Sequence, residues 1–129
     1  MVELTPINLN QRRVLIVDDD GNTIALLKRF LEECGAIVES ATTARGALER
    51  LKSWVPDIVV SDFVMPDDGK HLAARAKELQ IPAIAVSGRA LPEQQQEILA
   101  SGFDVCVTKP FDPDELGRII ANRLKTTAT

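Results

Sequence analysis

The sequence predicts an α/β fold, a doubly wound five-stranded parallel sheet with helices on both faces that forms a (βα)5 three-layer sandwich. Short apolar runs rich in valine and isoleucine, typical of buried strands, alternate with longer segments whose apolar residues recur at helical spacing. Glycine and proline stand between these segments, where a chain turns. A length of 129 residues suits one domain of this class.

Each expected element has its own local signal. The strands are expected at residues 13–17, 36–40, 58–62, 83–86 and 104–108. The first helix is expected over 22–34, and the second from the capping residue Thr43 to Leu51. The third is expected after a turn at 67–69, with Leu72, Ala76 and Leu79 as the apolar stripe along its buried face. The fourth runs from 91–93 to Gly102, and the fifth begins at the capping sequence 112–115 and continues to Leu124.

Composition limits the class of protein. Hydrophobic residues make up 45% and charged residues 26%, as in a globular domain. A net charge of −4 without a basic run disfavours direct nucleic-acid binding, and no apolar run is long enough for a membrane span. The two cysteines have no metal or disulfide spacing, so we expect a cytoplasmic protein. Residues 1–12 are expected to form a flexible arm, 13–125 the domain and 126–129 a flexible tail.

Functional side chains stand at four of the expected strand ends. Asp18, Asp19 and Asp20 follow the first strand, and Asp62, Ser87 and Lys109 end or follow the third, fourth and fifth. Because the carboxyl ends of parallel strands share one edge, these groups are expected to form one site. Clustered carboxylates need a cation, and their oxygens suit Mg²⁺ or Mn²⁺. A carboxylate held there can attack phosphorus and form an aspartyl phosphate.

In four stretches the sequence resembles the receiver domains of two-component response regulators. These are Val17 to Asp20, Pro56 to Pro66, Val86 to Gly88 and Thr108 to Phe111. The resemblance covers residues 13–125 and implies the flavodoxin-like arrangement of that family. The stretches 55–57 and 102–109 look most like receivers attached to hybrid sensor histidine kinases.

The resemblance implies a role for each site residue. It makes Asp62 the acceptor of a phosphoryl group from a phosphohistidine. Mg²⁺ is held by Asp62 itself, by Asp19, by Asp18 through water and by the backbone carbonyl of Val64. Ser87 and Lys109 bind the phosphoryl group. The implied partner is a histidine kinase or histidine phosphotransfer domain. The implied domain catalyses only its own phosphorylation and dephosphorylation. We also expect it to be a monomer.

Two departures from the family pattern affect these expectations. The loop after Pro66 has one residue fewer than usual, and Cys106 stands where the family often has an aromatic residue. Asp20 is equally well explained as a helix-start residue. Asp57 is better explained as a turn residue before the strand than as a ligand. The only histidine, His71, is expected on a solvated helix face.

Two other functions are compatible with parts of the sequence. The stretch from Val17 to Thr23 looks like the motif of haloacid-dehalogenase-like phosphatases with one residue inserted, which makes Asp18 the nucleophile and Asp20 the acid/base. That hypothesis leaves Asp62 without a role. The second alternative is an interaction module that is never phosphorylated.

Overall fold

The computed structural model describes residues 6–64, 69–88 and 91–125. Five helices alternate with five strands, as the sequence predicts. The strands are β1 (Arg13–Val17), β2 (Ile37–Ala41), β3 (Ile58–Asp62), β4 (Ala83–Ser87) and β5 (Val105–Thr108). The helices are α1 (Gly21–Glu33), α2 (Ala44–Leu51), α3 (Gly69–Glu78), α4 (Pro92–Ala100) and α5 (Pro113–Lys125). The expected turn at 67–69 falls mostly outside the described residues, as do the short loop after Pro66 and the tail.

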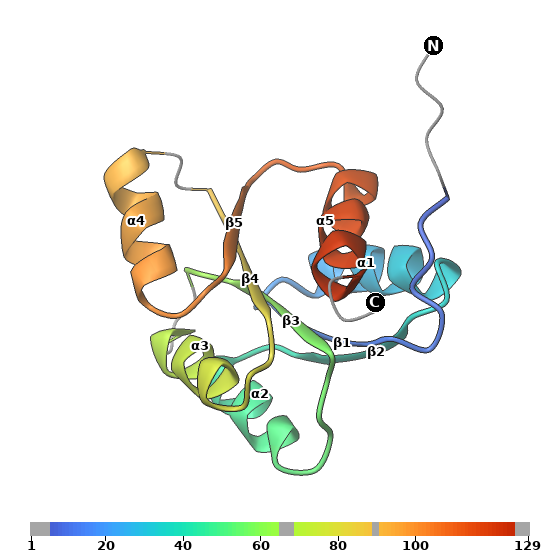
Figure 1. Ribbon diagram of the computed structural model, residues 1–129, viewed down its shortest axis with the longest axis horizontal. Coiled ribbons are helices and arrows are strands. Elements are labelled where there is room, and N and C mark those ends of the chain that lie inside the picture. The colour runs from blue at the N-terminus through green and yellow to red at the C-terminus, as the bar shows by residue number, and fades with distance from the viewer. Residues whose placement is uncertain (1–5, 65–68, 89–90, 126–129) are drawn as a thin grey trace.

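The strands form one parallel sheet in the order β2-β1-β3-β4-β5. Helices α1 and α5 cover one face, while α2, α3 and α4 cover the other (Figure 1). Alternate residues of the central strands enter the two apolar cores, because successive side chains of a strand point to opposite faces. Val14 and Ile16 pack toward α1 and α5, whereas Leu15 and Val17 pack toward α2 and α3. None of the helices in the described ranges has the length and apolar character that a membrane crossing requires.

The prediction of a loose arm over residues 1–12 is wrong for its second half. Leu9 is only 1% exposed and belongs to the core between the sheet, α1 and α5. Its N–H donates to the carbonyl of Cys34 at 2.9 Å, and the N–H of Gln11 donates to the carbonyl of Gly35 at 2.9 Å. Gly35 has a φ of +100°, and a Cβ there would lie 2.9 Å from the Cα of Asn10. Residues 7–12 therefore belong to the folded domain.

Smaller differences concern the ends of elements. The apolar stripe predicted for the third helix wrongly includes Leu79, because α3 ends at Glu78 and Leu79 is 38% exposed. Gln80 turns the chain with a φ of +60°, so the buried apolar residue beyond the helix is Ile81. The second and fifth strands begin one residue later than expected, at Ile37 and Val105.

Candidate functional site

Backbone pairing fixes the four strand ends that carry the site. The N–H of Asp18 donates to the carbonyl of Ala41 at 3.1 Å, next to the last pair of β1 and β2. The N–H of Phe63, directly after Asp62, donates to the carbonyl of Val86 at 3.0 Å. The N–H of Lys109 donates to the carbonyl of Ser87 at 2.8 Å. The functional side chains therefore start from positions that the sheet itself holds in place.

Three aspartates meet at this edge. One carboxylate oxygen from each of Asp18, Asp19 and Asp62 lies within 4.8 Å of the other two. Asp18 and Asp62 are buried, at 4% and 8% exposure, whereas Asp19 is exposed. Three converging carboxylates with one face open to solvent form a set of hard oxygen ligands that fits a divalent cation such as Mg²⁺. The side chains present therefore agree with the metal that the sequence predicts.

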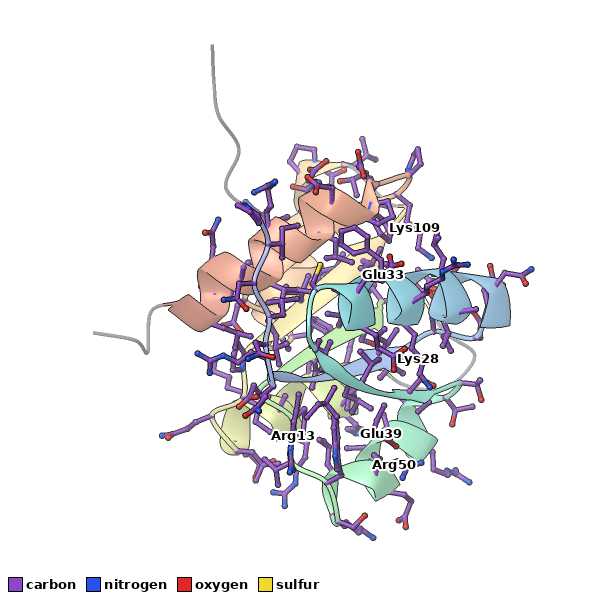
Figure 2. The ribbon with its side chains drawn as sticks, turned by 90° about the vertical axis from the view of Figure 1, so that its right-hand side faces the viewer. Arg13, Lys28, Glu33, Glu39, Arg50 and Lys109 are labelled. Carbon is purple, nitrogen blue, oxygen red and sulfur yellow. The ribbon has the colours of Figure 1, made fainter. Side chains whose placement is uncertain are left out.

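Lys109 bridges two of these acids. Its Nζ lies 3.3 Å from Oδ2 of Asp62 and 3.6 Å from Oδ2 of Asp18. Figure 2 shows Lys109 at the end of the domain away from Arg13, which begins β1. Burial opposes the charged form of Lys109, but the two carboxylates outweigh it and raise the pKa of the ammonium group. The lysine is thus a fixed positive charge inside the acidic cluster.

Asp62 lies at the centre of the arrangement. Its Oδ1 accepts the N–H of Val64 at 3.1 Å, and its Oδ2 faces Lys109. Burial raises the pKa of this carboxyl group, and the charge of Lys109 and the Val64 hydrogen bond offset that rise only in part. Val64 itself is 50% exposed, so this residue lies at the solvent-facing side of the domain next to Asp62. Ser87 is fully buried at the end of the neighbouring strand β4.

The structure separates the other acidic residues from this cluster. Asp20 is the N-cap of α1, because its carboxylate accepts the N–H of Asn22 and the hydroxyl of Thr23 at 3.0 Å each. These hydrogen bonds lower the pKa of Asp20, that from the Thr23 hydroxyl most strongly. Asp57 lies at the opposite edge, where its Oδ2 accepts the N–H of Arg13 at 2.8 Å. The helix-start interpretation of Asp20 is confirmed, while Asp57 lies at a bend before β3, outside the acidic cluster.

Sequence reasoning found the side chains that meet here but missed the backbone groups that hold them. The carbonyl groups of Ala41 and Val86 anchor two of the strand ends, and no residue type signals that role. The N–H of Asp20 also donates to Oδ1 of Asp18 at 2.9 Å, which orients the Asp18 carboxylate. The register of the sheet places the two carbonyl groups, whereas the Asp20 contact is a local turn between residues two apart.

Known proteins resemble this chain in sequence and in structure. Residues 14–121 match the response regulator receiver domain family. A 14.6 kDa protein of Leptolyngbya boryana is 44% identical over 87% of this chain and 89% of its own length. Response regulator Rre1 of Synechocystis is 32% identical over 86% of this chain but only 51% of its own length. Sensor histidine kinase RcsC of Salmonella typhi is 36% identical, over 84% of this chain and 12% of the kinase.

Two solved structures show the same fold. A CheY-like receiver domain of Methanospirillum hungatei is 32% identical, with a TM-score of 0.83 over 91% of this chain and 96% of that one. The receiver domain of a signal transduction histidine kinase from Syntrophus aciditrophicus is 30% identical, with a TM-score of 0.79 over 90% of this chain and 91% of that one. Fold, acidic strand ends and sequence agree, and the chain belongs to the response regulator receiver domains of two-component systems.

Proposed function

We propose that Asp62 is the phosphoacceptor of this receiver domain and takes a phosphoryl group from a phosphohistidine of a partner protein. One observation carries the proposal: the Asp62 carboxylate ends the central strand β3, with Oδ2 only 3.3 Å from Lys109 Nζ and Oδ1 accepting the N–H of Val64, inside the acidic cluster. In the reaction, an Asp62 oxygen forms a bond to phosphorus while the phosphorus–nitrogen bond of the donor breaks. The imidazole keeps the electron pair of that bond and takes up a proton.

The other residues prepare the site for this transfer. Asp19, Asp62, the backbone carbonyl of Val64 and, through water, Asp18 would hold Mg²⁺, which would neutralise charge on the incoming phosphoryl oxygens. Lys109 donates to a phosphoryl oxygen from the place where it now contacts Asp62. The Ser87 hydroxyl donates to a second oxygen. The domain thus acts on its own side chain and releases no product other than phosphate on hydrolysis.

Phosphorylation by a small donor tests this proposal. Acetyl phosphate with Mg²⁺ is expected to add one phosphoryl group, and a chelator is expected to prevent it, because the acidic cluster repels a phosphate dianion when no cation is bound. Intact-mass spectrometry measures the addition, and peptide mapping after borohydride reduction locates it. A modified Asp18 would favour the phosphatase hypothesis. No modification under any condition would favour the interaction module.

A second prediction concerns how phosphorylation affects the rest of the domain. Cys106 is half-buried on β5 and packs against the core beside α2, α3 and α4. A thiol is too small to turn between the surface and the interior as an aromatic ring does, so we expect weak coupling from Asp62 to the α4–β5–α5 face. We therefore propose a monomer that passes phosphoryl groups to or from a histidine-bearing partner docked near the exposed start of α1, around residues 22–25.

Amide chemical shifts with and without beryllofluoride, a mimic of the phosphoryl group, measure this coupling. Shifts are expected only in the described parts of the loops that follow Asp19, Asp62, Ser87 and Lys109, with no change in molecular size. Large shifts across residues 91–107 together with a new dimer would contradict the expectation.

A further inference from the structure

A second concave site lies at the amino edge of the sheet, opposite the acidic cluster. It is a pocket of about 500 Å³ lined by residues that precede β1, β3, β4 and β5 and by the last turn of α5. The strands are about 15 Å long, at roughly 3.3 Å per residue, so this pocket is well separated from Asp62. A pocket volume of 300–1,000 Å³ is typical of sites for small molecules.

Part of the lining is apolar, and two of its residues, Ile81 and Leu124, belong to the cores. Pro56 is buried in the loop before β3, Ile81 is 7% exposed before β4, and Leu124 is 5% exposed at the end of α5. These residues come from different segments, and core packing holds Ile81 and Leu124 in place. They offer a preformed apolar surface to one side of a ligand.

Three positively charged side chains line the same pocket. Arg12, Lys77 and Arg123 line it from three separate segments, the residues before β1, the last turn of α3 and the end of α5. The pocket also contains two acids, so its formal charge is +1, whereas the chain as a whole carries −4. Such a local reversal of sign favours an anion at this edge.

Both acids of the pocket are already bonded to the backbone. Oδ2 of Asp57 accepts the N–H of Arg13 at 2.8 Å, and Oδ2 of Asp104 accepts the N–H of Ala83 at 2.8 Å. Arg12 is half-buried, yet among the described residues neither Arg12 nor Lys77 has a carboxylate within ion-pair distance. Asp57 and Asp104 thus bind the backbone at the starts of β1 and β4. The N–H groups of the Arg12 and Lys77 side chains are therefore available to bind a ligand.

We infer that this pocket binds a small organic anion, a phosphate or carboxylate group carried on an apolar body. The guanidinium of Arg12 offers paired donors that match either oxyanion, and Lys77 adds a second charge. The apolar body lies against Pro56, Ile81 and Leu124. This inference is independent of the proposed function, because it involves the other edge of the sheet and none of the acidic-site residues.

Phenyl phosphate is a suitable probe because it carries a phosphate group on an apolar ring. Inorganic phosphate and phenol, which each have only one of these two parts, are the comparison ligands. In ¹⁵N-resolved titrations without Mg²⁺, phenyl phosphate is expected to give saturable shifts at the amides of Asp57, Gly102 and Asp104. Each comparison ligand is expected to bind at least about fivefold more weakly, since each lacks one kind of contact. Equal affinity for inorganic phosphate, or shifts confined to the region of Asp62 and Lys109, would overturn the inference.

Three variants separate specific binding from a general effect of charge. Arg12→Gln and Lys77→Gln are each expected to weaken phenyl phosphate binding, the first by about tenfold because it removes a charge-assisted pair. Arg29→Gln removes the same charge from an exposed position on α1 and is expected to leave the affinity unchanged. Lys77 is exposed, so its variant will fold even if Arg12→Gln does not. Unchanged affinity in Lys77→Gln, or an equal loss in Arg29→Gln, would refute the proposed site.

Discussion

Asp62→Asn is expected to accept no phosphoryl group from acetyl phosphate and Mg²⁺. An amide nitrogen or oxygen is a poor nucleophile compared with a carboxylate, and the change also replaces one of the three converging carboxylates by a neutral amide. The side chains are nearly equal in size, so the fold is expected to persist. Intact-mass spectrometry over a time course, with circular dichroism to verify folding, measures the outcome.

Asp57→Asn is the matched control for this experiment. Asp57 precedes the same strand, but its carboxylate lies at the opposite edge and accepts the N–H of Arg13. This variant is expected to be phosphorylated at the rate of the parent. Asp18→Asn tests the competing hypothesis, since a phosphatase of the haloacid-dehalogenase type would lose its nucleophile there. If Asp62→Asn were labelled like the parent while Asp18→Asn were not, the assignment of Asp62 would be wrong.

Leu9→Ala is expected to give a large loss of stability, although Leu9 lies outside the helices and strands. Leu9 is 1% exposed and fills space between the sheet, α1 and α5, so its truncation leaves a cavity in the core. Such changes reduce the free energy of unfolding by about 2–5 kcal/mol, and the tight packing here places Leu9 near the middle of that range. Urea unfolding followed by circular dichroism gives the value.

Leu26→Ala provides the control, because it removes the same atoms from a side chain that is 58% exposed. Its unfolding free energy is expected to stay within about 0.5 kcal/mol of the parent. Equal stability of the two variants would mean that residues 7–12 are not part of the cooperative unit. That result would return the domain boundary to residue 13, where the sequence alone places it.

Most of the fold and the site was predictable because its signals are local. The run from Ile58 to Val60 is fully buried on both faces of the sheet, and its composition already indicates a strand. The polar residues at 18, 62, 87 and 109 interrupt or follow such runs, and the rule that parallel strands share one carboxyl edge brings them together. Neither step needs a long-range contact to be known in advance.

The features that sequence reasoning missed depend on contacts between distant segments. Leu9 is not part of a sequence segment with helical or strand periodicity, and its burial follows only from the space between α1 and α5. Ile7 occupies a comparable place, where a Cβ on Gly117 would lie 3.1 Å from its side chain. The pocket at the amino edge has no signature at all, since each lining segment contributes only one to three residues. Tertiary packing decides these features, and no local pattern records them.

The position of Lys109 has a consequence for the entropy of phosphoryl binding. The lysine follows β5, which lies two strands away from β3, so its side chain extends across the end of β4 to reach Asp62. A free lysine side chain loses about 2 kcal/mol of rotational freedom when it is held in one place. Here folding has already ordered it between two carboxylates. An arriving phosphoryl group therefore exchanges one oxygen partner of the ammonium group for another and does not have to immobilise a mobile chain.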